Sequence, residues 1–175
     1  MKVRETKLPG VYLIEPERQS DDRGFFARTF CSRELAELGL VSTIAQSSIS
    51  FNPTEGTLRG MHYQAPPHGE TKIIRCTMGA IWDCLIDLRP DSPTYRGWLA
   101  EELTAENRKL FYVPEGIAHG FLTLAPNTEV FYEISTFFVP EAARGVRWDD
   151  PAFGVDWPRR PRLLSDRDRT YEDFE

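Results

Sequence analysis

The chain has 175 residues, of which 41% are hydrophobic and 27% are charged, with a formal net charge of −6. This composition is typical of a globular protein, and we expect a single domain over residues 1–175. The acidic balance argues against a general affinity for nucleic acid, whose phosphates favour a basic surface.

The first third of the chain contains three predicted strands and one predicted helix. Residues 32–40 (SRELAELGL) predict the helix, because Ser32 can cap its start, Glu34 lies in its first turn and Gly39 ends it. The strands are predicted from alternating or β-rich patterns. They are residues 11–17, 24–30 and 42–51.

The middle of the chain is the clearest β-rich section. Its predicted strands are separated by short turns such as Met78-Gly79, AENR and APNT. They are residues 72–77, 80–88, 98–104, 109–116, 118–124 and 129–136. Short strands at this spacing predict an all-β sandwich or barrel with one or two short peripheral helices. We expect the charged tail, residues 159–175, to pack along the outside.

The sequence gives several indications of where the protein resides. The N-terminal residues MKVRETKLPG lack the apolar segment of a signal peptide, and no apolar run has the length needed to span a bilayer. The three cysteines, Cys31, Cys76 and Cys84, show no Cys-x-x-Cys spacing. This pattern favours free thiols in a reducing compartment. We therefore predict a cytoplasmic protein without a membrane partner.

Residues 114–119 (PEGIAH) match the pattern Pro-x-Gly-x-x-His, and in this respect the chain resembles a cupin, a jelly-roll barrel. Metal-binding cupins usually carry His-x-His on a strand, where side chains two apart share a face. Here the corresponding residues are His62 and Gln64, while His68 and Glu70 lie in a following turn. We predict no metal, and a metal-dependent cupin enzyme, such as a dioxygenase or isomerase, stays the alternative.

Without a metal, His62 and His119 are free for another task. Imidazoles titrate near neutral pH and are natural general bases, although each histidine could also be a satisfied residue of the barrel interior. The interior would also hold Arg59, Lys72 and Tyr132. So many polar groups are costly to bury unless they hold a ligand, and we predict a pocket there.

Further motifs cover nearly the whole chain in order. They are residues 22–26, 58–64, 87–89, 92–95, 114–121, 129–132, 140–141, 147–151, 157–158 and 164–168. Together these motifs resemble the nucleotide-sugar 3,5-epimerases, typified by dTDP-4-dehydrorhamnose 3,5-epimerase. The resemblance implies a jelly-roll fold, usually a homodimer, with the substrate in the barrel mouth and no metal or organic cofactor.

The implied reaction inverts C3, C5 or both in a nucleotide-diphospho-4-keto-6-deoxy sugar, a step of rhamnose-like deoxysugar biosynthesis. By the resemblance, His62 is the base and Asp168 is its partner. Tyr132 is the acid on the opposite face of the sugar ring, and Lys72 lies near the C4 oxygen. Such a reaction passes through an enolate, which needs a base, an acid and a cation or donor at the oxygen.

The resemblance also implies a set of substrate-binding residues. Arg23 and Arg59 would meet the diphosphate, since the guanidinium fork can bind two oxygens at once. Phe26 would lie against the nucleotide base. The remaining members would form the pocket wall or stack there. They are Gln46, His119 and Phe138.

The sequence departs from the family pattern near the expected nucleoside end. Arg28 lies in a region where a glutamate is usual, Ser47-Ser48 replaces Asp-Asn, and Phe138 replaces a tyrosine. The nucleotide could therefore be dTDP, CDP or GDP. A non-enzymatic nucleotide-sugar binder is a further alternative, but binding alone does not need an acid and a base on opposite faces of a sugar.

Overall fold

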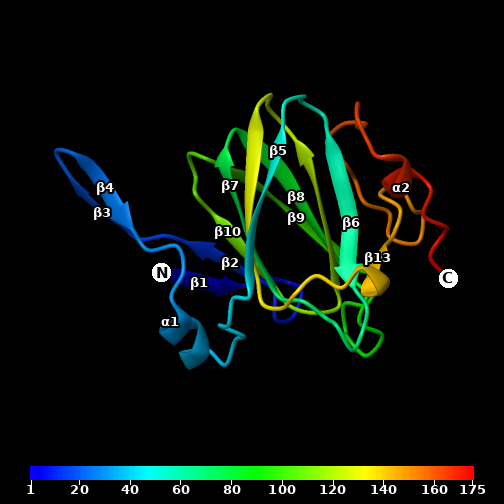
Figure 1. Ribbon diagram of the computed structural model, residues 1–175, viewed down its shortest axis with the longest axis horizontal. Helices are drawn as coiled ribbons and strands as arrows, with labels where there is room; N and C mark the ends of the chain where they lie inside the picture. Colours follow the sequence, from blue (N-terminus) through cyan, green and yellow to red (C-terminus); the bar gives the residue numbers. More distant parts are fainter.

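Two antiparallel sheets face each other in the computed structural model, which describes residues 1–175 (Figure 1). The six-stranded sheet has the spatial order β1 (Lys2–Glu5), β2 (Tyr12–Glu15), β10 (Leu110–Val113), β7 (Lys72–Met78), β12 (Thr128–Ile134), β5 (Gln46–Asn52). The five-stranded sheet has the order β13 (Ala143–Gly145), β6 (Leu58–Gln64), β11 (Ile117–Thr123), β8 (Ala80–Asp87), β9 (Trp98–Thr104). The predicted all-β, jelly-roll class is confirmed.

The predicted strands are all present, with ends that differ by a few residues. The tight turns between them do not form hairpins, because each carries the chain from one sheet to the other. They connect β7 to β8, β9 to β10 and β11 to β12. At the first of these, Gly79 has a φ of +75°, and a Cβ there would overlap the Thr128 side chain. Only glycine fits that turn without strain.

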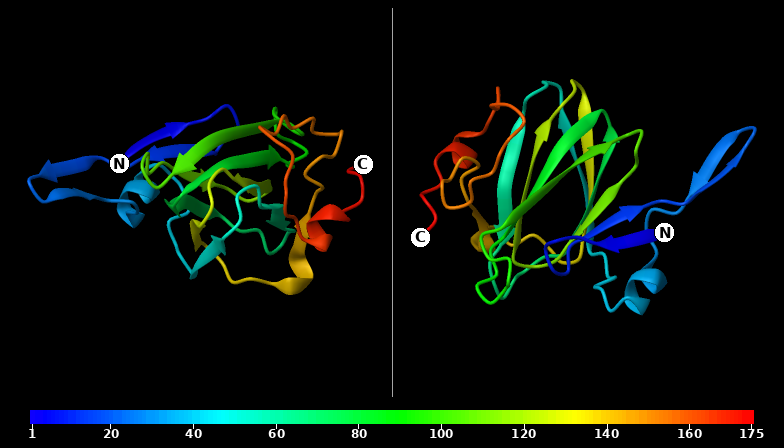
Figure 2. Two further views of the ribbon diagram at one scale, coloured as in Figure 1. Left: turned by 90° about the horizontal axis from the view of Figure 1, so that it is seen from above. Right: turned by 180° about the vertical axis from the view of Figure 1, so that it is seen from behind.

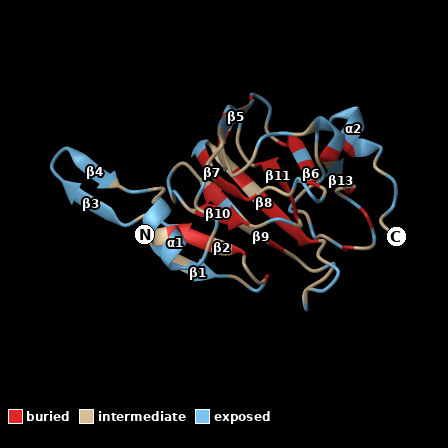
Figure 3. Cartoon of the chain, turned by 60° about the horizontal axis from the view of Figure 1, so that its bottom comes forward, coloured by how far each residue is buried: buried red, intermediate tan, exposed pale blue.

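The space between the sheets is filled at one end by a cluster of fourteen buried apolar residues. Ile74 and Val130 reach it from the six-stranded sheet, and Leu85 and Phe121 reach it from the five-stranded sheet. Each such side chain stabilises the fold by about 1.5–3 kcal/mol when it is fully buried. Tyr132 packs against this cluster, so the apolar core directly adjoins a region that contains polar side chains. Figure 3 shows how burial concentrates in the two sheets.

Two short α-helices and one 3-10 helix lie at the periphery. They are α1 (Ser32–Glu37), α2 (Asp166–Arg169) and η1 (Pro140–Ala142). The N-cap of α1 is Cys31 and makes no side-chain hydrogen bond, so the prediction that Ser32 caps this helix is wrong. Gly39 ends the helix as predicted: its φ is +72°, and it donates to Ala36 O. No helix in the chain is both long and apolar enough to cross a bilayer.

The two ends of the chain lie on opposite sides of the sandwich. The hairpin of β3 (Arg18–Asp21) and β4 (Gly24–Ala27) projects away from the body, as Figures 1 and 2 show from three directions. The C-terminal segment packs outside β6, where Leu163 accepts a hydrogen bond from Leu58 N. The outer position predicted for the tail is confirmed, and α2 also brings one carboxylate, Asp168, inward.

Candidate active site

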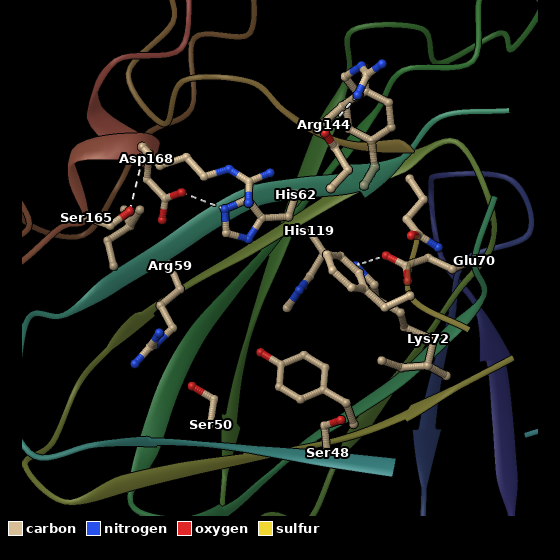
Figure 4. A pocket seen from close by; sticks show the side chains of 18 of the residues that line it. Ser48, Ser50, Arg59, His62, Glu70, Lys72, His119, Arg144, Ser165 and Asp168 are labelled. Carbon is tan, nitrogen blue, oxygen red and sulfur yellow. Dashed lines mark hydrogen bonds and ion pairs between the residues drawn. The ribbon is translucent and has the colours of Figure 1, made fainter. Parts of the chain in front are cut away.

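A cavity of about 660 Å³ opens beside the core, between the two sheets and the C-terminal segment (Figure 4). Side chains from strands β5, β6, β7, β11, β12 and β13 and from helix α2 line it. Seven of the ten site residues predicted from the sequence belong to this lining. They are Arg59, His62, Lys72, His119, Tyr132, Phe138 and Asp168.

His62 forms a hydrogen-bonded pair with Asp168, and His62 is the more exposed of the two residues. The His62 Nε2 and Asp168 Oδ1 atoms are 2.6 Å apart, and the two side chains are 38% and 4% exposed. Gly60 N also donates to Asp168, and Ser165 Oγ accepts from Asp168 N at the start of α2. Burial alone would raise the pKa of Asp168, but the bonds from His62 and Gly60 hold this pKa below its usual value.

A second histidine–carboxylate pair, His119 with Asp83, lies deeper in the sandwich. Its Nε2–Oδ1 distance is 2.7 Å, and the side chains are only 5% and 0% exposed. Burial raises the pKa of Asp83, with His119 acting in the other direction. The other oxygen of this carboxylate, Oδ2, is buried without a partner. Asp83 was not predicted from the sequence, although a charged residue inside the apolar run AIWDCLI was a usable signal.

Tyr132 reaches the cavity from the sheet opposite to His62, since it lies on β12 while His62 lies on β6. Its ring packs edge-on against His119, with 5.9 Å between the ring centroids. Burial raises the pKa of Tyr132 strongly, and the negative charge of Asp83 adds to this effect. The phenol therefore stays protonated at any pH at which the protein would work.

Lys72 lines the same cavity at the start of β7 and forms an ion pair with Glu70. Glu70 was assigned to the turn between β6 and β7. It does lie in that connection, but its side chain also lines the cavity, which was not predicted from the sequence. His68 is exposed in the same connection, as predicted for a turn residue.

Three arginines supply positive charge to the cavity wall. Arg59 donates from Nε to Asn52 Oδ1, so its terminal nitrogens remain available to a ligand. Arg144 of β13 and Arg167 of α2 also line the cavity. Neither was predicted from the sequence, although Arg167 is adjacent to the predicted Asp168. This arrangement suits an anionic group such as a diphosphate.

Three predicted binding residues do not line the cavity of the same chain. Arg23 and Phe26 lie on the projecting β3–β4 hairpin, where the Arg23 side chain is 89% exposed and pairs with Asp21. Phe26 is also exposed there. Gln46 lies at the edge of the cavity, where its Oε1 accepts from Phe138 N at 2.7 Å. The hairpin projects because its two strands pair only with each other.

Gln64, at the position of a cupin metal ligand, holds two loops together instead. Its Nε2 donates to His68 O and its Oε1 accepts from Val139 N. No three histidine, cysteine, aspartate or glutamate side chains in the chain gather closely enough to hold a metal ion. The position expected for a second metal ligand is therefore occupied by a residue that shapes the cavity rim.

Comparisons with known proteins agree with this geometry. A family model described as dTDP-4-dehydrorhamnose 3,5-epimerase matches residues 5–175. The enzyme of that name from Shigella flexneri is 37% identical over 175 residues, covering 99% of this chain and 96% of the relative. The enzyme from Methanothermobacter thermautotrophicus is 40% identical over 172 residues, with coverages of 96% and 91%.

Solved structures show the same fold. A dTDP-4-dehydrorhamnose 3,5-epimerase from Bacillus anthracis, with TDP and PPi bound, has a TM-score of 0.94 and 39% identity, covering 99% of both chains. ChmJ, a 3'-monoepimerase from Streptomyces bikiniensis in complex with dTDP-quinovose, has a TM-score of 0.89 and 30% identity, with coverages of 96% and 85%. Both similarities extend over the strands that line the cavity.

Proposed function

The chain belongs to the dTDP-4-dehydrorhamnose 3,5-epimerase family, and on that premise we propose that it inverts C3, C5 or both in a nucleotide-linked 4-keto-6-deoxy sugar. One observation carries the proposal: His62, paired with Asp168 of α2, and the Tyr132 phenol line one cavity from opposite sheets. The nucleotide ligands named for the solved relatives support a substrate of this class.

His62 acts as the base that removes the proton next to the C4 ketone. Its Nε2 is committed to Asp168 Oδ1, which leaves the Nδ1 lone pair to take a proton from the substrate. Asp168 is held ionised, so it fixes this tautomer and stabilises the imidazolium that forms. A base placed in this way typically accelerates a reaction by about 10²–10⁴-fold.

Tyr132 returns a proton to the other face of the same carbon, which inverts it. Because its phenol stays protonated, it is ready to donate as soon as the enolate forms. Lys72 stabilises the negative charge that develops on the C4 oxygen, and His119 lies beside Tyr132 in the wall. No redox step is needed, since one proton leaves and another is delivered.

The active unit is a homodimer in which the β3–β4 hairpin of one protomer covers the cavity of the other. In this arrangement, Arg23 contacts the diphosphate and Phe26 lies against the nucleotide base of the substrate in the other protomer. Neither residue lines the cavity of its own protomer. The arrangement also accounts for the exposed aromatic rings of Phe25 and Phe26. The three unpaired cysteines fit a cytoplasmic location for this enzyme.

Mixed dimers test this arrangement. His62→Ala and Phe26→Ala protomers, each weak alone, should regain activity when they are refolded together, because one hybrid cavity then carries both native residues. Sedimentation equilibrium should give the mass of two chains. A monomer, or a mixture without recovered activity, would contradict the shared cavity.

The nucleotide can be identified by comparing dTDP, CDP and GDP. Ser48 lines the cavity where the family pattern differs, and Arg28 pairs with Glu34 beyond the hairpin. These departures alter the nucleoside end, and we expect a preference that differs from strict dTDP binding. Calorimetry with the three nucleotides measures it, and a clear preference for dTDP would remove this part of the proposal.

The reaction itself is tested by NMR in D₂O with nucleotide-linked 4-keto-6-deoxy sugars. Deuterium should enter at each carbon that is inverted, with no added metal. Tyr132→Phe should still exchange the proton that His62 removes but should form little inverted product. If no sugar exchanges, or if the purified protein carries stoichiometric iron or zinc, the epimerase mechanism proposed here is wrong.

A further inference from the structure

The Lys72–Glu70 ion pair is the charged pair of the cavity that contains a lysine, in contrast to the two histidine–carboxylate pairs. Lys72 Nζ lies 2.8 Å from Glu70 Oε1, and each side chain is only 10% exposed. Both residues line the cavity (Figure 4). An ammonium group has three N–H donors, so pairing with one carboxylate oxygen leaves donors for a substrate oxygen.

The chain around Glu70 is fixed from two sides. Thr71, which follows it, donates its N–H to Ser135 Oγ and accepts from Ser135 N, each at 2.9 Å. Buried Gln64 donates to His68 O, two residues before Glu70. The connection that carries Glu70 is therefore tied to the ends of β6 and β12 before any substrate binds.

We propose that Glu70 is a positioning residue, which holds the Lys72 ammonium at the place where the enolate oxygen develops. A lysine side chain is a point charge on a long flexible stem, so it needs a fixed partner to occupy one position. A donor stabilises a developing oxyanion best when it is placed in advance. The sheltered carboxylate supplies that fixed partner. This inference rests on the function proposed above.

Replacement of the carboxylate by its neutral isostere tests the inference. Glu70→Gln should lower kcat by about 10- to 100-fold, because a displaced donor stabilises the transition state less. KM should change by less than about twofold, since the displaced donor acts on charge that develops only in the transition state. Glu70→Asp, which retains the charge, should recover part of kcat.

Glu115→Gln is the matched control. Glu115 is exposed and lies against Gly69 in the same connection, but the ion-pair partner of Lys72 is Glu70. This variant should retain the wild-type kcat. An equal loss in Glu115→Gln and Glu70→Gln would assign the effect to the loop and overturn the positioning role.

A double-mutant cycle separates positioning from general structural damage. In a Lys72→Ala background, Glu70→Gln should cause no further loss of deuterium exchange, because there is no ammonium left to position. An additive loss would overturn the inference, as would an unchanged kcat in Glu70→Gln alone. Failure of the wild type to exchange any substrate proton would instead refute the proposed function, and the positioning role with it.

Discussion

The two histidine–carboxylate pairs of this protein use the same residue types in different surroundings. His62 and His119 face each other in the register of β6 and β11, yet His62 is open to the cavity while His119 is almost fully enclosed. Asp168 accepts an additional backbone N–H, whereas Asp83 keeps one buried oxygen unpartnered. The pKa shifts of the two carboxylates therefore have opposite signs.

This difference shows that the surroundings of a histidine–carboxylate pair decide which protonation state its carboxylate favours. Hydrogen bonds keep the Asp168 carboxylate ionised beside an accessible imidazole, which suits proton transfer. Burial disfavours the charge on Asp83, and that charge in turn raises the pKa of Tyr132. We therefore expect the His62–Asp168 pair to control catalysis. We expect the His119–Asp83 pair to affect the stability of the fold and the protonation of Tyr132.

The largest contrast should come from removing each histidine. His62→Ala should lower exchange at each inverted carbon by about 10²–10⁴-fold, with little change in the free energy of unfolding. His119→Ala should instead lower the stability by about 3–5 kcal/mol, since it leaves Asp83 buried without its partner. Exchange kinetics and urea unfolding measure the two effects.

The exposed turn residue His68 provides the control, because His68→Ala should change neither quantity. If His62→Ala retained exchange at both carbons, His62 would not be the base. If His119→Ala were as stable as the wild type, the two pairs would not differ in their contribution to stability.

The next effect concerns the tautomer of His62. Asp168→Asn should lower kcat by about 10²–10⁴-fold with KM nearly unchanged, because an amide can donate to Nε2 and so turn the proton of the imidazole towards the substrate. Steady-state kinetics measure this split. If kcat of this variant were within about threefold of the wild-type value, Asp168 would only pack against the histidine.

A smaller effect is expected at the buried pair. The folded-state pKa of Asp83 is raised, so its stabilising contribution is complete at acidic pH and is lost as the pH rises through that pKa. Asp83→Asn has no such loss. The Tm of this variant should therefore rise relative to the wild type as the pH is raised above about 4, the usual pKa of an unfolded aspartate. A constant difference would mean that the charge is not the cause.

The smallest effect is expected at Asp168, where the dependence of stability on pH has the opposite sign. Its pKa is lowered, so its contribution is present above the unfolded-state value and is lost as the pH falls below about 4. Thermal melts between about pH 5 and pH 3 should show a steeper decline for the wild type than for Asp168→Asn, by about 1–2 °C. Parallel declines would contradict the bonding ascribed to this carboxylate.

The strands were predictable because alternating and β-rich patterns report directly on which residues can be buried on a sheet. The pairing of the strands was not, since a turn such as Met78-Gly79 reverses the chain without specifying whether the next strand joins the same sheet. The helix start was also misplaced by one residue, because Cys31 rather than Ser32 has the extended backbone of an N-cap.

The motifs of the sequence by themselves determined the family, the fold class and seven residues of the cavity, five of which lie within the short matching segments. Only the tertiary structure decided the surroundings of each side chain. It brought Asp83 to His119 and Glu70 into the wall, and it placed Arg23 and Phe26 on a projecting hairpin. The reason is physical: burial, charge and hydrogen bonding depend on residues distant in the chain, and these set what each group can do.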